Sequence, residues 1–137
     1  MQALVLDSNI VLDLWVFHDP GVAELRAAIQ SGDCRYIATV AMREELLRVL
    51  GYQAIDLRLR QQGLSVQDVL RKFDALASVV DAAPRAPIAC KDPDDQKFID
   101  LAVAHPAWLF SKDKAVLAMK KRLHDLGCVL NPGLKKR

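Results

Sequence analysis

Short apolar runs alternate along the chain with longer segments in which apolar residues recur every three or four positions. The short runs have the length and composition of buried strands; they are ALVL (3–6), RYIATV (35–40), SVVDAA (78–83), AWLF (107–110) and CVL (128–130). The longer segments predict helices over residues 10–15, 22–30, 41–50, 55–77, 94–105 and 114–126, with a break in the fourth near Gly63. Apolar strands separated by helices are typical of an α/β fold whose parallel sheet is covered on both faces.

The length of 137 residues and the hydrophobic content of 52% suit one compact domain, and no linker or internal repeat divides residues 1–137. No apolar run approaches the roughly 20 residues that a membrane span requires, and no signal-peptide pattern opens the chain, so we expect a cytoplasmic protein without membrane contact. The net charge of +2 permits nucleic acid binding without indicating it. The last three residues, 135–137, form a basic tail that we expect to be solvated.

Cysteine and histidine give no sign of a zinc site or of a disulfide framework. Cys34, Cys90 and Cys128 are widely spaced and form no CxxC pair, so we expect them to be small core residues. The three histidines stand alone in the sequence. The candidate chemistry therefore lies with the acidic residues.

Acidic residues follow two of the predicted strands, and ligands bind beyond the carboxyl ends of strands in open parallel sheets. Asp7 comes directly after ALVL, and Asp113 comes shortly after AWLF. Asp92 and Pro93 suit the N-cap and the first position of the helix that follows them. Asp95 differs, because steps of three, four and seven residues from it land on apolar positions. Its carboxylate should therefore lie at the N-terminal end of the buried face of that helix.

The predicted helix at 41–50 carries two neighbouring candidates. Its apolar stripe places Glu45 at the edge of the buried face and Glu44 about 100° further round, so Glu45 is the inward candidate and Glu44 the alternative. Each acid taken alone could be a helix cap or an ion-pair partner. If Glu45 and Asp95 converge with the two acids that follow strands, their repulsion raises their pKa values unless a cation neutralises them. Oxygen-only ligands suit Mg²⁺ or Mn²⁺, which can activate a water against a phosphodiester, and this indicates a nuclease.

Five motifs occur in order over nearly the whole chain: LVLDSNIVLDL, EELLRVL, KDPDDQKFIDLAVA, LFSKDKAVL and VLNP. As an ordered set they resemble the PIN-domain ribonucleases, in particular the bacterial, VapC-like branch of toxins from toxin–antitoxin systems. The resemblance implies a single PIN domain with a three-layer α/β/α fold, a parallel sheet of about five strands in the order 3-2-1-4-5, and an acidic groove at the carboxyl ends of the central strands. It also implies metal-dependent cleavage of single-stranded RNA with one or two Mg²⁺ or Mn²⁺ ions, a homodimer, and an antitoxin protein as partner.

The resemblance assigns roles to individual residues. The residues that match the family's catalytic and metal-binding acids are Asp7, Glu45, Asp95 and Asp113. Asn9 would hold the first of these aspartates, and Ser111, in place of the family's commoner threonine, would hydrogen-bond the metal-site carboxylates or a water. Asp92 would cap its helix or support the ligands from outside.

Cations close to these acids in the sequence are candidates for contacts with RNA phosphate, and they are Arg43, Arg48, Lys112 and Lys114. Lys112 is a departure from the family, which commonly has a small residue at this position. It places a positive charge directly beside the presumed ligand Asp113.

Three other classes of protein share features with this chain. Phosphatases of the haloacid-dehalogenase type also open with strand, Asp and helix, but they need a second acid where this chain has Asn9. A response-regulator receiver needs adjacent acids after its first strand and a lysine after its last, a pattern that this chain lacks. A PIN-like module that binds RNA or protein without cutting remains an alternative. The loss of one acid would favour it, and all four are present.

Overall fold

The computed structural model of the protein describes residues 1–134, and the basic tail at 135–137 lies outside the described residues. At its centre is one sheet of five strands: β1 (Gln2–Leu6), β2 (Cys34–Ala38), β3 (Ala77–Val79), β4 (Trp108–Phe110) and β5 (Val129–Leu130). Each strand is parallel to its neighbours, and the order across the sheet is β3-β2-β1-β4-β5. The predicted α/β class and the strand order 3-2-1-4-5 are therefore confirmed.

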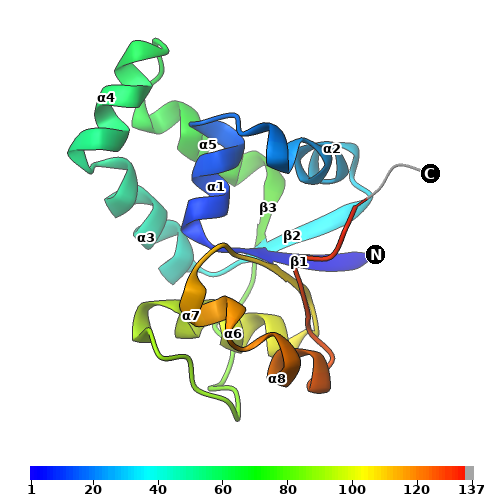
Figure 1. Cartoon of the computed structure of the whole chain (residues 1–137). Helices are drawn as coiled ribbons and strands as arrows, with labels where there is room; N and C mark the ends of the chain where they lie inside the picture. The colour runs from blue at the N-terminus through cyan, green and yellow to red at the C-terminus, as the bar shows by residue number, and fades with distance from the viewer. Residues whose placement is uncertain (135–137) are drawn as a thin grey trace.

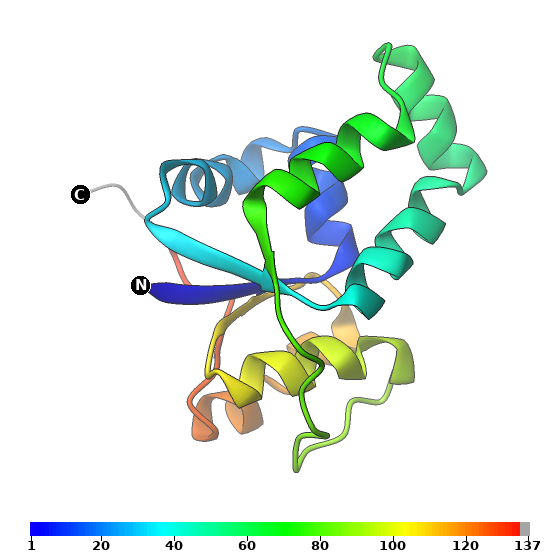
Figure 2. The ribbon, with the colours of Figure 1, turned by 180° about the vertical axis from the view of Figure 1, so that it is seen from behind.

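Helices cover both sides of this sheet (Figure 1, and from behind in Figure 2). One side carries α1 (Ser8–Trp15), the short η1 (Pro20–Val22), α2 (Ala23–Ser31), α4 (Gln53–Gln61) and α5 (Val66–Leu76). The other side carries α6 (Gln96–Ala104), α7 (Lys114–Leu117) and α8 (Lys120–Asp125). Between β2 and α4 the chain runs through α3 (Val40–Leu50), which starts at the carboxyl edge of the sheet. No helix within residues 1–134 is long and apolar enough to cross a membrane.

The core packs against both faces of β1, the central strand, whose last three residues are buried. On the α1 side, Trp15, Tyr36 and Phe73 form a row of aromatic contacts, with ring centroids 6.4 Å apart for the first pair and 5.7 Å apart for the second. On the other face, α6 contributes the buried Phe98 and Ile99. Apolar contact on both faces holds β1 in place, and this positions the residues that follow it.

Two predicted strands end earlier than expected, and one residue explains both. Thr39 leaves β2 to cap α3, with its hydroxyl oxygen accepting from the N–H of Met42 at 3.4 Å. Because β2 ends at Ala38, the third strand has no further backbone to pair with once Val80 has donated its N–H to Ala38 O at 2.8 Å. The predicted strands at 35–40 and 78–83 are therefore shorter in the structure, at Cys34–Ala38 and Ala77–Val79.

The predicted helix at 114–126 is two helices in the structure, α7 and α8. Between them the N–H of Met119 donates to Val116 O at 2.9 Å, a three-residue hydrogen bond that tightens the chain. Val116, Met119 and Leu123 are all buried, so the apolar spacing of two short helices equals that of one continuous helix. The predicted helix at 94–105 likewise begins as a 3-10 turn, η2 (Pro93–Asp95), before α6.

The cysteines follow the prediction in part. Cys90 and Cys128 are buried, Cys34 at the start of β2 is half-buried, and all three thiols are free. Burial raises the pKa of the Cys128 thiol to about 11, so this side chain remains protonated and behaves as an apolar core residue.

Candidate metal centre

The carboxyl ends of β1 and β4 bring two segments of the site together. The two strands are neighbours, with Leu6 opposite Phe110, and the N–H of Asp7 donates to Phe110 O at 3.1 Å. Asp7 directly follows β1, and Ser111 directly follows β4. The two residues therefore lie next to each other at the edge of the sheet. Residues distant in the sequence meet here because parallel strands end at the same edge of the sheet.

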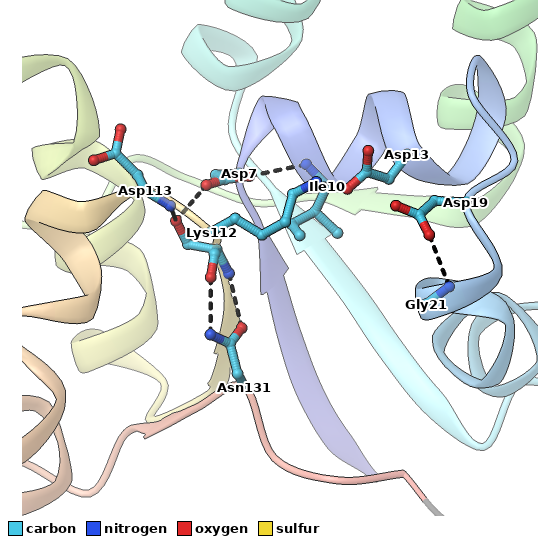
Figure 3. A network of polar contacts seen from close by, with 9 residues as sticks. Asp7, Ile10, Asp13, Asp19, Gly21, Lys112, Asp113 and Asn131 are labelled. Atoms are coloured by element: carbon cyan, nitrogen blue, oxygen red, sulfur yellow. Dashed lines mark hydrogen bonds and ion pairs between the residues drawn. The ribbon is translucent and has the colours of Figure 1, made fainter.

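Asp7 is buried, with 3% of its surface exposed, and both of its carboxylate oxygens accept hydrogen bonds. Oδ1 accepts from the N–H of Ile10 at 2.9 Å, which makes Asp7 the N-cap of α1, and Oδ2 accepts from the Ser111 hydroxyl (Figure 3). Burial is the main cause that raises the pKa of the Asp7 carboxyl, and the two hydrogen bonds oppose it. The neighbouring charges of Asp113 and Glu45 raise this pKa further.

Asn131, at the end of β5, holds the segment that carries Ser111 (Figure 3). The amide oxygen of Asn131 accepts from the N–H of Ser111 at 3.0 Å, and its Nδ2 donates to Ser111 O at 2.8 Å. Ser111 Oγ in turn accepts from the N–H of Asp113 at 3.1 Å. Asn131 has a φ of +49°, a left-handed conformation that asparagine tolerates better than most residues. Sequence reasoning missed this role, although the VLNP motif contains the residue.

Three carboxylates converge beside this segment. Asp92, Asp95 and Asp113 each offer an oxygen atom, and these atoms lie within 4.8 Å of one another. Asp92 caps η2 by accepting from the N–H of Asp94 at 3.0 Å, and Asp113 caps α7 by accepting from the N–H of Ala115 at 2.9 Å. Each of these two acids thus keeps a helix start in place while presenting its carboxylate to the cluster.

Asp95 contributes a carboxylate oxygen that lacks a hydrogen-bond partner. It is buried, with 9% of its surface exposed, and its Oδ2 accepts no hydrogen bond within the described residues. The pKa of the Asp95 carboxyl is raised to about 7, mainly by burial. A hydrogen bond with Asp113 and the charge of Asp113 also raise it. The neighbouring charges of Asp92 and Asp7 contribute in the same direction. A buried carboxylate without a partner among other carboxylates is the arrangement that a divalent cation stabilises.

Asp92 lies nearer to the other acids than its sequence position indicated. From the sequence we expected a capping or supporting role outside the ligand set, and the structure shows the cap. Its carboxylate nevertheless lies within the cluster itself, beside Asp95 and Asp113. The reason is that the 3-10 turn η2 places the capping residue and the third residue after it on the same side of the turn.

Of the two neighbouring glutamates on α3, Glu45 faces the site and Glu44 is exposed. The Glu45 side chain is 13% exposed, and both of its oxygens are engaged. Lys97 on α6 places its Nζ 2.7 Å from Oε1, and the Ser8 hydroxyl donates to Oε2. Neither Lys97 nor Ser8 was anticipated as a partner, because they lie 52 and 37 residues from Glu45 along the chain.

Asn9 does not hold Asp7 as the resemblance implied. It is exposed, and the described residues show no hydrogen bond between its side chain and the Asp7 carboxylate. Two residues along a helix correspond to a rotation of about 200°, so a side chain at this position points away from the N-cap. The support expected from Asn9 comes instead from Ser111 and from the N–H of Ile10.

Two of the four candidate phosphate-binding cations are engaged elsewhere in the protein. Arg43 forms a bidentate ion pair with Asp74 on α5, with both N–O distances at 2.8 Å. Lys112 extends toward α1 and places its Nζ 2.5 Å from Oδ2 of Asp13, a buried acid that sequence reasoning missed (Figure 3). Hydrogen bonding to Asp13 raises the pKa of the Lys112 ammonium. The other two candidates, Arg48 and Lys114, are exposed.

The family follows from comparison of the sequence with known families. The model of the family described as PIN domain matches residues 3–115, a span that contains the three clustered acids as well as Asp7 and Glu45. The chain belongs to the PIN domain family. PIN domains are generally nucleases.

A solved structure shares the fold of this PIN domain. It is the crystal structure of VapBC2 from Rickettsia felis bound to a DNA fragment from their promoter. The likeness has a TM-score of 0.61 at 13% sequence identity and covers 95% of this chain and 98% of that chain. At this level of identity it shows that the two chains have the same fold. A search of curated proteins gave no match.

Proposed function

We propose that this PIN domain is a metal-dependent endoribonuclease that cleaves single-stranded RNA and acts as the toxin of a toxin–antitoxin pair. The observation that carries the proposal is the unpartnered Oδ2 of Asp95, buried beside the carboxylates of Asp92 and Asp113. Leaving a charged oxygen without a partner in such a place costs free energy. A cation bound by the three acids would recover that cost.

The donor set favours Mg²⁺ or Mn²⁺ over zinc. All three clustered ligands are carboxylate oxygens, with no cysteine or histidine among them. Hard oxygen donors suit these two ions, which commonly keep several bound waters. When bound, such an ion lowers the pKa of a coordinated water and stabilises negative charge on a phosphate. Asp92, Asp95 and Asp113 would hold the ion, and Asp7, adjacent to them, would add negative charge.

The remaining residues of the site orient these acids. Ser111 and the N–H of Ile10 fix both oxygens of Asp7, so the direction of this carboxylate is set before any ligand binds. Asn131 fixes Ser111 in turn. A site held in this way needs little rearrangement when substrate arrives, which is a general requirement of electrostatic catalysis.

RNA as substrate and the toxin role are the finer parts of the proposal. The exposed Arg48 and Lys114 could contact phosphate at the rim, whereas Arg43 and Lys112 would first have to leave their ion pairs with Asp74 and Asp13. The fold likeness to a VapBC complex supports an antitoxin protein as partner, and we include a homodimer and action in the cytoplasm on the same family grounds.

The direct test is cleavage of a labelled single-stranded RNA by the purified protein. We expect cleavage with Mn²⁺ or Mg²⁺ and none in EDTA, and a loss of at least about tenfold in rate for Asp95→Asn. The matched control is Asp94→Asn, the same change at the neighbouring exposed acid, which should cleave like the wild type. Cleavage that persists in EDTA and survives Asp7→Asn would refute the metal mechanism. Metal binding without cleavage of any RNA would favour a binding module instead.

A further inference from the structure

Lys97 places a fixed positive charge inside the acidic site. Its Nζ lies 2.7 Å from Glu45 Oε1, 2.6 Å from the carbonyl oxygen of Asp94, and 4.9 Å from the ring centroid of Phe98. The side chain is 28% exposed, which is low for a lysine. Contacts with a carboxylate, a carbonyl and an aromatic ring together hold this ammonium in one place.

Glu45 is fully engaged by this arrangement. Its Oε1 contacts Lys97, and its Oε2 accepts from the Ser8 hydroxyl. The Glu45 side chain is 13% exposed, so water screens the ion pair less than it would on the open surface. An ion that approached Glu45 would have to displace an ammonium that is already in contact and partly shielded from solvent.

The carboxylates of the site therefore fall into two groups. Asp92, Asp95 and Asp113 converge on a common point and include the unpartnered Oδ2 of Asp95. Glu45, which contacts Ser8, the residue after Asp7, already has its counter-ion in Lys97. Within residues 1–134 the first group is the one set of three metal-ligating side chains that come together.

We propose that Lys97 is a built-in cation of this site, which occupies the Glu45 side and limits the centre to one divalent ion held by Asp92, Asp95 and Asp113. The inference rests on the proposed metal-dependent function and specifies it. Nucleases with two metal ions use both positive charges to stabilise the attacking and leaving oxygens. Here the ammonium of Lys97 supplies the second charge, fixed by the fold rather than recruited from solution.

Removal of this charge should open a second site. In Lys97→Met the side chain keeps its apolar length over Phe98, but Glu45 loses its counter-ion. Glu45, which the Ser8 hydroxyl holds beside Asp7, would then be free to bind an ion, and one or two carboxylates with waters are enough to bind Mg²⁺ or Mn²⁺. If Lys97 only tied α6 to α3, its removal would loosen the contact between these helices without changing the number of bound ions.

The experiment counts bound Mn²⁺ per chain from the free-ion signal in electron paramagnetic resonance, with calorimetric titration as a second measurement. We expect one Mn²⁺ per chain in the wild type and two in Lys97→Met. Lys91→Met, which removes an exposed lysine beside Asp92 without touching Glu45, should keep one. Glu45→Gln combined with Lys97→Met should also keep one, because the new site needs the Glu45 charge.

Each outcome decides a different point. Two ions in the wild type, or one ion in folded Lys97→Met, would overturn the role of Lys97 while leaving a metal-dependent nuclease in place. No bound Mn²⁺ in any variant would instead remove the proposed metal function, and the role of Lys97 with it. If Lys97→Met does not fold, as judged by circular dichroism, Lys97→Gln replaces it, and the wild-type count still tests the single-ion site.

Discussion

The clearest quantitative consequence of the site concerns Asp95→Asn in the metal-free protein. The pKa of the Asp95 carboxyl is about 7 in the folded protein, against an ordinary value of 3.8. The folded state therefore holds a proton that the unfolded chain releases, and stability falls as the pH rises from about 4 to about 7. Asparagine has nearly the same shape and carries no charge, so the variant should lack this fall.

The magnitude follows from the two pKa values. Between these two values, each pH unit lowers the free energy of unfolding by about 1.4 kcal/mol. The total loss of stability at pH 8 is therefore at most about 4 kcal/mol. Asp92 and Asp113 are half-buried, so water reaches the cluster and screens part of the repulsion. We therefore expect Asp95→Asn to be more stable than the wild type by about 2 kcal/mol at pH 8 in EDTA, and nearly equal to it at pH 4.

The assay is urea unfolding of the wild type and Asp95→Asn at both pH values in EDTA, with Asp94→Asn as the exposed control. Saturating Mn²⁺ should reduce the difference between the wild type and Asp95→Asn at pH 8, because an ion present at 100 times its dissociation constant stabilises the wild type by about 2.7 kcal/mol and the variant by less. A loss of more than about 2 kcal/mol for Asp95→Asn in EDTA at pH 8 would refute the reasoning. It would mean that the ionised Asp95 supports the fold rather than strains it.

Two further substitutions test the surroundings of the cluster. Ser111→Ala removes the donor to the buried Asp7 Oδ2 and should lower the free energy of unfolding by about 1–3 kcal/mol in urea, whereas Ser111→Thr keeps the hydroxyl and should stay close to the wild type. Lys112→Ala leaves the buried Asp13 without its counter-ion and should cost about 1 kcal/mol, while Lys114→Ala should change stability by less than about 0.5 kcal/mol. Unchanged stability in Lys112→Ala together with weaker RNA binding would show that Lys112 serves substrate rather than Asp13.

Much of the fold could be predicted from local pattern. Short apolar runs separated by amphipathic segments are enough to indicate a parallel sheet covered on both faces. The N-caps were equally local. The side chain of an acidic or hydroxyl residue directly before a helix accepts a hydrogen bond from a free N–H group in its first turn. Asp92 caps η2 as its sequence context predicted. Ser65 likewise forms a capping box with Asp68, three residues further on, at the start of α5. The strand order itself came from the resemblance to PIN domains.

The limits of local pattern appear first at the element ends. The spacing of Val116, Met119 and Leu123 fits one helix as well as two, and only the packing of α7 and α8 under the sheet distinguishes them. The length of β3 depended on where its partner strand turned away at Thr39. Neither outcome is encoded in the segment where it occurs.

The partners of the site residues were decided by tertiary structure alone. Ser111 reaches Asp7 across 104 residues, and Lys97 reaches Glu45 across 52. Helical and strand periodicity depend on contacts between residues a few positions apart, so they predict which face an acid occupies. The group that meets it there depends on strand register and on the packing of helices from opposite ends of the chain. The sequence by itself thus determined that Asp7, Glu45 and Asp95 point inward, but not that Asp13 is buried. The packed fold determined that Asp95 faces other carboxylates while Glu45 faces a lysine.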